Sequence, residues 1–362
     1  MKKKIFITDL IGKYCGMHYY DNAFKSLLEQ YQYDVRILSN YTDAQSTFFP
    51  MIFRKQKIYS ILLLIFSYIK FINFLFTHKK GNFIYLSYGE LYDIPFLFIS
   101  FFTPRIIIDV HEVYALKYSG KHIVSKIIKT LYRYAVHNII YHSARTLNIL
   151  QGIKYNGRKI YIEHLNYKFK KEYEISHISQ DVLNSYQTDR LKFLFFGNLS
   201  KVKGIDIIIE IFSHLDNVSL EKIELVIAGK NVDAINFDTI RMRSNYIHII
   251  DRHINDDELI YLYQKTDLIL LPYRKSSQSG IAAMGIYFQK PMILSKIPYF
   301  EEIIHQCPSN SRIIDLQKYG EYIKEIINDS NKKNITKINL DINKEREKKY
   351  KDFISELKQF LK

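Results

Sequence analysis

The feature that most constrains the fold of this 362-residue chain is an alternation of short β-rich runs with helical patterns along its whole length. Such runs predict strands at residues 4–8, 35–38, 83–87, 105–110, 138–141 and 159–162 in the first half. In the second half they predict strands at 191–197, 223–228, 246–250, 268–272, 291–294 and 312–315. Because helical patterns separate most of these strands, the sequence predicts an α/β fold with parallel sheets wound by helices.

The domain organisation follows from length and from one break in this rhythm. A chain of this length exceeds what one hydrophobic core supports, so two domains of roughly 150 to 200 residues are expected. A polar stretch at 168–189 interrupts the alternation. The expected organisation is a first domain at 1–170, a linker at 171–190, a second domain at 191–340 and an amphipathic C-terminal helix at 341–362.

Cysteine usage and charge narrow the functional class. The two cysteines, Cys15 and Cys307, fall in different expected domains, which supports neither a disulfide framework nor a cysteine metal site and favours a reducing, cytoplasmic compartment. The net charge is +15, and residues 117–171 hold twelve basic residues against the single acid Glu163. A basic face of this kind suits an anionic membrane, a polyphosphate ligand or nucleic acid, and charge alone does not separate the three.

Two helical patterns bear on membrane contact. The segment 58–76 is apolar over nearly the length of a bilayer span, but its polar residues share one helical stripe, which predicts a buried or interfacial amphipathic helix rather than a span. The polar stripe consists of Lys57, Ser60, Ser67, Lys70 and Asn73. A second helix, at 121–133, carries cations on one face, which is either a solvated face or a contact with anionic lipid. These residues are His122, Lys126, Lys129 and Arg133.

Several motif classes are missing from the sequence. It contains no Walker A motif and no G-x-G-x-x-G fingerprint, so P-loop nucleotide hydrolysis and ordinary dinucleotide binding are unsupported. The pair His111 and Glu112 is followed by Ala115 where a zincin needs its second histidine, and no Asp-x-Asp occurs. We therefore expect no essential metal and no other cofactor.

Two strand-to-helix loops in the second half are candidate anion sites. In the first loop, Gly197 allows close backbone approach, the following helix offers its N-terminus and Lys203 adds a positive charge. The alternative interpretation is an ordinary turn with a solvated lysine. In the second loop, a strand ends at Pro272 and a helix begins near Gly280, so the amides of Ser279 and Gly280 can bind phosphate.

These segments resemble retaining glycosyltransferases of the GT-B fold, particularly glycosyltransferase family 4. Residues 197–204 match the family motif G-x-L-x-x-x-K-G, so the resemblance implies donor-diphosphate binding by Gly197, Asn198 and Lys203. Residues 270–293 are similar to the family's donor-binding strand, loop and helix. The resemblance therefore implies that Ser279 and Gly280 bind the donor. The implied fold is two Rossmann-like, doubly wound domains that face a central cleft, with the C-terminal helix returning to the first domain.

The sequence departs from the family pattern at two places. The arginine that usually follows the first glycine of the motif is Asn198 here. The family's two glutamates, eight positions apart, correspond to Ser276 and Met284, and the local S-x-S-G pattern resembles a subset of bacterial GT-B enzymes that lack these glutamates. The ribose contact and the stereochemical outcome, retaining or inverting, therefore stay open.

Two further residues in the first half are implied by the same resemblance. Residues 109–114 resemble the family's His-Asp motif, which implies that His111 acts as a sugar or acceptor contact or as a proton relay. A purely structural histidine is the alternative. The N-terminal loop corresponds to one that lies against the donor phosphates in GT-B enzymes, which implies that Gly12 contacts the donor. The alternative is that Gly12 and Gly16 only permit tight backbone turns.

Together these features predict transfer of a hexosyl or related group from a UDP- or GDP-sugar to a hydroxyl of a glycan acceptor, lipid-linked, in bacterial capsule, exopolysaccharide or O-antigen synthesis. The nucleotide-sugar donor is a substrate, an anionic membrane is a further expected partner and nucleic acid is not. The expected location is cytoplasmic, with peripheral attachment to the inner face of the plasma membrane. The alternatives are a GT-B-fold sugar-nucleotide epimerase, expected to carry carboxylates for acid/base work, and a non-catalytic basic membrane-binding module.

Overall fold

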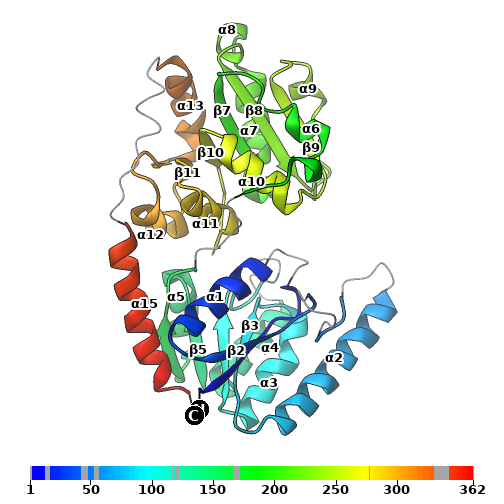
Figure 1. The fold of residues 1–362 in the computed structure, drawn as a ribbon, viewed down its shortest axis with the longest axis vertical. Coiled ribbons are helices and arrows are strands. Elements are labelled where there is room, and N and C mark those ends of the chain that lie inside the picture. Colours follow the sequence, from blue (N-terminus) through cyan, green and yellow to red (C-terminus); the bar gives the residue numbers. More distant parts are fainter. Residues whose placement is uncertain are drawn as a thin grey trace. The chain divides into compact units, whose positions relative to one another are not determined.

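A computed structural model describes residues 2–12, 17–41, 48–52, 57–115, 118, 122–165, 172–276, 278–329 and 342–361. The chain divides into two compact units. Unit 1 comprises Met1–Lys168 and Asn343–Lys362, and unit 2 comprises Phe169–Ile342. Each unit contains a six-stranded sheet flanked by helices, as Figure 1 shows.

Unit 1 has an all-parallel sheet with the order β2-β1-β3-β4-β5-β6. Its strands are β1 (Lys4–Thr8), β2 (Asp34–Leu38), β3 (Asn82–Ser87), β4 (Ile106–Val110), β5 (Asn138–Tyr141) and β6 (Arg158–Tyr161). Its first helices are α1 (His18–Gln30), α2 (Lys57–Thr77), η2 (Leu91–Asp93), α3 (Ile94–Phe102), α4 (Ile123–Tyr134) and α5 (Ala144–Gly152). The strand order reverses between β1 and β3, and open α/β sheets bind ligands at the carboxyl ends of strands beside such a reversal.

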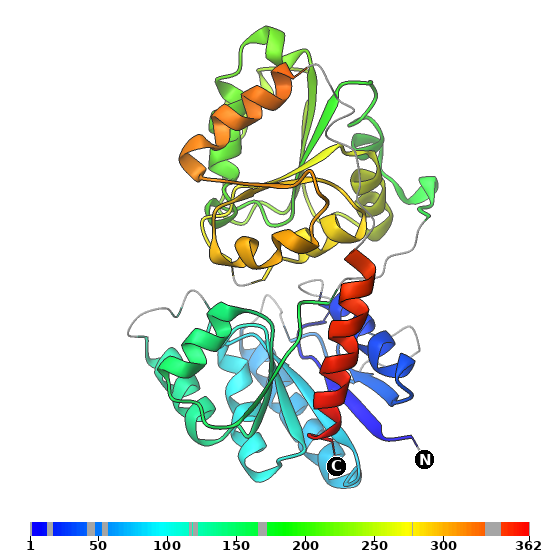
Figure 2. The same ribbon diagram turned by 90° about the vertical axis from the view of Figure 1, so that its left-hand side faces the viewer.

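The C-terminal helix α15 (Ile342–Lys358) belongs to unit 1 (Figure 2). Phe353 and Leu357 are buried, and the Phe353 ring lies 6.1 Å from that of Phe24 in α1. Lys3 beside β1 donates from Nζ to the carbonyl of Leu361 at 3.0 Å. The predicted return of the C-terminal helix to the first domain is therefore confirmed.

Unit 2 also has an all-parallel sheet, with the order β12-β11-β10-β7-β8-β9. Its strands are β7 (Leu191–Phe196), β8 (Ile223–Gly229), β9 (Ile247–Asp251), β10 (Leu268–Leu271), β11 (Met292–Ser295) and β12 (Arg312–Ile314). Its helices are α6 (Gln180–Leu183), α7 (Ile205–Ser213), α8 (Asn217–Leu220), α9 (Asp238–Arg241), α10 (Asp256–Lys265), α11 (Gly280–Tyr287), α12 (Pro298–Ile303) and α13 (Tyr319–Asn328). Short 3₁₀ turns are η4 (Ile175–His177), η5 (Lys201–Lys203), η6 (Ile304–Gln306) and η7 (Leu316–Lys318).

The predicted strands are all confirmed, with bounds that differ by at most one residue at either end. In unit 2 the strand order reverses between β7 and β10, so the two loops singled out in the sequence follow the two strands at the reversal. The predicted α/β class, with two doubly wound sheets, is also confirmed.

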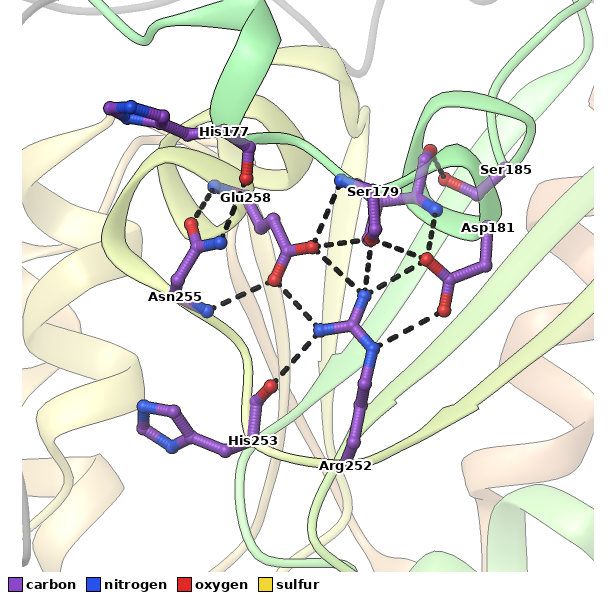
Figure 3. A network of polar contacts seen from close by, with 9 residues as sticks. His177, Ser179, Asp181, Ser185, Arg252, His253, Asn255 and Glu258 are labelled. Atoms are coloured by element: carbon purple, nitrogen blue, oxygen red, sulfur yellow. Dashed lines mark hydrogen bonds and ion pairs between the residues drawn. The ribbon is translucent and has the colours of Figure 1, made fainter.

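The segment 172–190, predicted as a linker, lies in unit 2 and is anchored to α10 (Figure 3). The Arg252 guanidinium donates to both carboxylate oxygens of Glu258 at 2.8 Å and to Asp181 at 2.9 Å. The Ser179 amide donates to the same Glu258 carboxylate at 3.2 Å. Asn255 and Glu258 also cap the start of α10 reciprocally. The polar side chains of this segment therefore attach it to the rest of unit 2.

Helix α2 covers the segment that the sequence predicted as a buried or interfacial amphipathic helix. Its buried residues are Ser67, Phe71 and Leu75. Within the described part of the chain it is the one helix long and apolar enough to cross a membrane, and only 17% of its apolar window is buried. Periodicity identifies the two faces of a helix but does not say which of them meets the protein.

Candidate functional site

The two loops at the strand-order reversal of unit 2 are in contact. Gly197 follows β7 with a φ of +109°, and Gly204, at the start of α7, has a φ of +77°. A Cβ atom on Gly204 would lie 2.1 Å from the carbonyl oxygen of Pro272, which follows β10. Only glycine combines this backbone conformation with so close an approach, so the loop after β7 rests on the loop after β10.

An arginine that the sequence analysis missed holds these loops together. The Arg274 guanidinium donates two parallel hydrogen bonds to Asp206 in α7, at 2.7 and 2.8 Å. The backbone N–H of Arg274 donates to the carbonyl of Val202 at 3.0 Å. Burial opposes the charge on Asp206, but the Arg274 contacts outweigh it and lower the pKa of that carboxyl. Bidentate pairing of this kind fixes the relative geometry of the two loops.

The ammonium group of Lys203 lies over the ring of Tyr273, 3.9 Å from its centroid. Tyr273 is buried after β10, and its carbonyl accepts a hydrogen bond from Ser295. A cation over an aromatic face is held electrostatically without losing its charge. Across the described ranges no carboxylate forms an ion pair with Lys203, so this charge is available to an anionic ligand.

The loop after β10 brings Ser279 and Gly280 to the same ring. The Ser279 hydroxyl lies 3.4 Å from the Tyr273 hydroxyl and accepts from the amide of Ala282 at 3.2 Å, which caps α11. Gly280 is the first residue of α11. The first amides of a helix point outward and carry its positive end. Lys203 and the N-terminus of α11 are thus joined through Tyr273.

The remaining predicted donor residues in unit 2 are placed as follows. Asn198 is exposed in the loop after β7, beside Gly197. Ser276 donates from Oγ to the carbonyl of Gln278 at 2.6 Å, and Met284 is buried within α11. Neither Ser276 nor Met284 offers the carboxylate that the family pattern has at these positions.

In unit 1, His111 directly follows β4 and is buried. Its ring stacks on Tyr88 with centroids 5.3 Å apart and meets the Tyr20 ring edge-on at 4.6 Å. Its Nε2 atom lies 3.9 Å from Oδ2 of Asp109. His111 is therefore held at the carboxyl edge of the sheet by aromatic contacts beside a carboxylate.

A buried histidine–aspartate pair that the sequence analysis missed lies next to His111. Nδ1 of His142 is 3.0 Å from the carbonyl of Ile162, and since a carbonyl only accepts, Nδ1 carries a proton. Nε2 of His142 is 2.5 Å from Oδ1 of Asp109, whose Oδ2 accepts from the Tyr20 hydroxyl at 2.8 Å. Burial alone would raise the pKa of Asp109, but His142 outweighs it and lowers that pKa. Asp109 and His142 thus form a buried, directly hydrogen-bonded pair.

Asp109, His111 and His142 are also the described residues whose composition suits a metal ion, with ligand atoms within 4.8 Å of one another. Two ligands of one zinc ion, each about 2 Å from it, lie about 3 Å apart. The 2.5 Å between Asp109 and His142 is the length of a direct hydrogen bond, so no ion fits between these two atoms as they stand.

Two more carboxyl groups lie at the end of β1 and in α1. Asp9 accepts from the amides of Ile11 and Gly12 at 3.0 and 2.8 Å, and burial raises its pKa to about 6. Burial and the charge of Asp9 raise the pKa of Asp21. A Cβ on Gly12 would lie 2.3 Å from the Ser39 hydroxyl. The Gly12 amide is therefore used within the turn, and its predicted donor contact stays a prediction.

The missed residues share a signal that sequence reasoning can use. Asp109 interrupts an otherwise apolar strand, and Asp9 and His142 each directly follow a predicted strand. Because the carboxyl ends of parallel strands meet at one sheet edge, polar residues at these positions cluster.

Comparison with known proteins is consistent with this architecture. Residues 181–340 match the family described as "Glycosyl transferases group 1". Among curated protein sequences, none matches the chain. Sucrose-phosphate synthase from Thermosynechococcus elongatus superposes with a TM-score of 0.67 and 11% identity, over 99% of this chain and 98% of that one.

Two other solved structures bear on the alternatives. HepE from Anabaena, in complex with UDP and glucose, has a TM-score of 0.63 and 15% identity, over 99% of this chain and 100% of that one. UDP-GlcNAc 2-epimerase from Neisseria meningitidis, bound to UDP-GlcNAc, has a TM-score of 0.58 and 11% identity, over 98% and 100%. At these identities the likeness shows the fold alone, and the fold is GT-B.

Proposed function

We propose that this chain, a glycosyltransferase of the GT-B fold with a group 1 glycosyltransferase domain at residues 181–340, transfers a hexosyl or related group from a UDP- or GDP-sugar to a hydroxyl of a glycan. One observation carries the proposal. The uncompensated ammonium of Lys203 and the capped N-terminus of α11 meet at Tyr273, where β7 and β10 end.

This arrangement suits the departure of a nucleoside diphosphate. In the transfer, the bond from the anomeric carbon to the phosphate oxygen breaks, a bond to the acceptor oxygen forms and the acceptor hydroxyl loses its proton. Negative charge develops on the leaving diphosphate, and preorganised donors aimed at such charge supply much of an enzyme's rate. Lys203, the amides of Ser279 and Gly280, and the loop residues Gly197 and Asn198 are the proposed donor contacts. His111 is the proposed catalytic residue of unit 1, as a sugar or acceptor contact or a proton relay.

The proposed reaction uses no metal ion, because Lys203 and helix amides meet the charge of the leaving group. HepE, which has this fold, is in complex with UDP and with UDP-glucose, which supports a UDP-sugar as the first donor to test. The proposed acceptor is a lipid-linked glycan of bacterial capsule, exopolysaccharide or O-antigen synthesis. The enzyme would then be cytoplasmic and peripheral on the inner face of the plasma membrane.

An epimerase with this fold is the second candidate, because the Neisseria enzyme superposes on the chain. Epimerisation needs carboxylates that reach the sugar. The carboxyl groups of Asp9, Asp21 and Asp109 are fully buried and hydrogen-bonded within unit 1, which favours transfer. A non-catalytic membrane module leaves the glycosyltransferase domain without a role.

The test is a thermal-shift panel of UDP-, GDP- and other sugar nucleotides, followed by turnover with the donor that stabilises the protein most. A ligand present at 100 times its Kd stabilises the folded state by about 2.7 kcal/mol, so a true donor gives a clear shift. Selective stabilisation by one nucleotide class is expected. The proposal fails if no sugar nucleotide stabilises the protein, and conversion of the donor to its epimer without acceptor would establish the second candidate.

A further inference from the structure

Helix α2 of unit 1 packs one side against the protein and leaves many large apolar side chains exposed on the other. Ser67 is fully buried on the inner face, with Phe71 and Leu75. Lys70 reaches back along the protein, where its Nζ donates to the carbonyl of Phe48 at 2.6 Å. The exposed side chains of the outer face are Ile58, Tyr59, Ile61, Leu62, Ile65, Phe66, Ile69, Ile72 and Phe76.

The neighbouring helices extend this apolar surface. The buried residues of α2, α3 and α4 belong to one hydrophobic core, and the ring of Phe71 in α2 lies 4.9 Å from that of Phe96 in α3. Figure 1 shows these helices in unit 1. On α3, Phe98, Phe101 and Phe102 are exposed. On α4, Ile123 and Ile127 are exposed. Large apolar side chains exposed together on neighbouring helices mark an interaction site.

The charged residues of these three helices are all basic. Helices α2, α3 and α4 contain no aspartate or glutamate. Lys126 and Arg133 are exposed on α4, Lys57 begins α2, and Lys79 and Lys80 follow its end. Apolar side chains ringed by cations match an anionic lipid surface, where headgroups meet the cations and acyl chains receive the apolar groups.

We propose that the outer sides of α2, α3 and α4, the apolar-basic face, dock unit 1 onto an anionic lipid bilayer, with α2 lying in the plane of the interface. Phe71 and Leu75 hold α2 in the hydrophobic core, so it lies on the bilayer rather than across it. A second copy of the chain fits less well, because a two-fold interface sets each patch against itself and would bring cations against cations. The inference identifies the surface that would contact the membrane named in the proposed function. It rests on the proposed function only for the reason why the protein docks.

The experiment is cosedimentation of the full chain with vesicles of phosphatidylglycerol and phosphatidylcholine, and with vesicles of phosphatidylcholine alone. Binding to the anionic vesicles is expected, weakening with salt. Neutralising Lys126→Gln with Arg133→Gln should lower partitioning about 30-fold, from about fivefold per cation near the surface. The triple variant Ile61→Ser, Ile65→Ser and Phe66→Ser should lower it about tenfold or more at any salt, since it removes apolar area without touching the core.

Matched controls lie on unit 2. Met242→Ser removes a side chain that is 81% exposed, and Lys324→Gln removes an exposed cation of α13, and both should bind vesicles as the parent does. Circular dichroism and donor-induced thermal shift check that each variant is folded. If a variant loses vesicle binding but is still stabilised by the donor, the result tests the docking surface alone. If the parent binds vesicles but no sugar nucleotide stabilises it, the proposed function fails and the docking surface does not.

Three results would overturn the inference. The first is failure of the parent protein to bind anionic vesicles. The second is parent-like binding by both the triple and the double variant. The third is a dimer of the lipid-free parent that becomes a monomer in the triple variant, which would make the apolar-basic face an interface between copies of the chain.

Discussion

Replacement of Glu258 by glutamine should measurably loosen the attachment of residues 174–186 to unit 2. Glu258 is 1% exposed and accepts from Arg252, from the amide of Asn255 and from Ser179 (Figure 3). Burial opposes its charge, but the contacts with Arg252 and Ser179 prevail and lower its pKa from 4.5 to about 2. That difference corresponds to about 3 kcal/mol of stability at neutral pH.

The pH dependence has a defined sign. Because the folded-state pKa is depressed, the stabilisation is fully present above pH 4.5 and is lost as the pH falls toward 2. Glu258→Gln should therefore cost about 3 kcal/mol at pH 7 and less than half of that at pH 3. Arg252 keeps about a third of its side chain exposed, so water limits the cost of leaving it unpaired.

The assay is urea-dependent hydrogen exchange, read from peptides covering residues 174–186 and 252–265 at pH 7 and pH 3. Segment-specific readout is needed because a chain with two units does not unfold in one two-state step. Glu325→Gln, on the exposed side of α13, is the matched control and should change stability by less than about 0.5 kcal/mol. The reasoning is refuted if Glu258→Gln behaves like this control, or if its cost is as large at pH 3 as at pH 7.

Three further predictions concern other parts of the chain. Gly204→Ala should destabilise unit 2 by about 2 kcal/mol or more in urea unfolding, because the new Cβ would meet the Pro272 carbonyl. The control Gly152→Ala places its Cβ in open space and should be neutral or slightly stabilising. Burial raises the pKa of Asp93 to about 6, so ionisation of Asp93 lowers the stability of unit 1 as the pH rises from about 4 to 6. Asp93→Asn should remove this part of the pH dependence of the urea midpoint of unit 1. His111→Ala should lower kcat about 100-fold or more while donor-induced thermal stabilisation persists, and equal losses of both would point to a structural histidine.

The strands and the loop chemistry of unit 2 could be predicted because each depends on local sequence. Apolar runs mark buried parallel strands, and the polar or glycine residues after them mark the sheet edge where ligands bind. Residues such as Lys203 and Ser279 come together because β7 and β10 are neighbours in the sheet. That neighbour relation follows from the topology expected of a doubly wound fold.

Other features depend on tertiary contacts that no local pattern contains. The polarity of residues 172–190 predicted a linker, but their partners Arg252 and Glu258 lie about seventy residues downstream. The stripe on α2 was visible, but which side packs on the sheet is decided by Phe71 and Leu75. The hydrogen bond between Asp109 and His142 joins two strands that are separate in the sequence, so no local pattern predicted it.

The central claim is that Lys203 supplies a charge to the donor diphosphate, and calorimetric titration of that nucleotide into three proteins tests it most directly. The parent is compared with Lys203→Ala and with Lys201→Ala, which removes an exposed cation two residues away in the same turn. A charge-assisted hydrogen bond is worth about 1.5 to 3 kcal/mol, so Lys203→Ala should raise Kd by about 10- to 150-fold, with Lys201→Ala close to the parent. Equal affinity of the parent and Lys203→Ala would contradict the account.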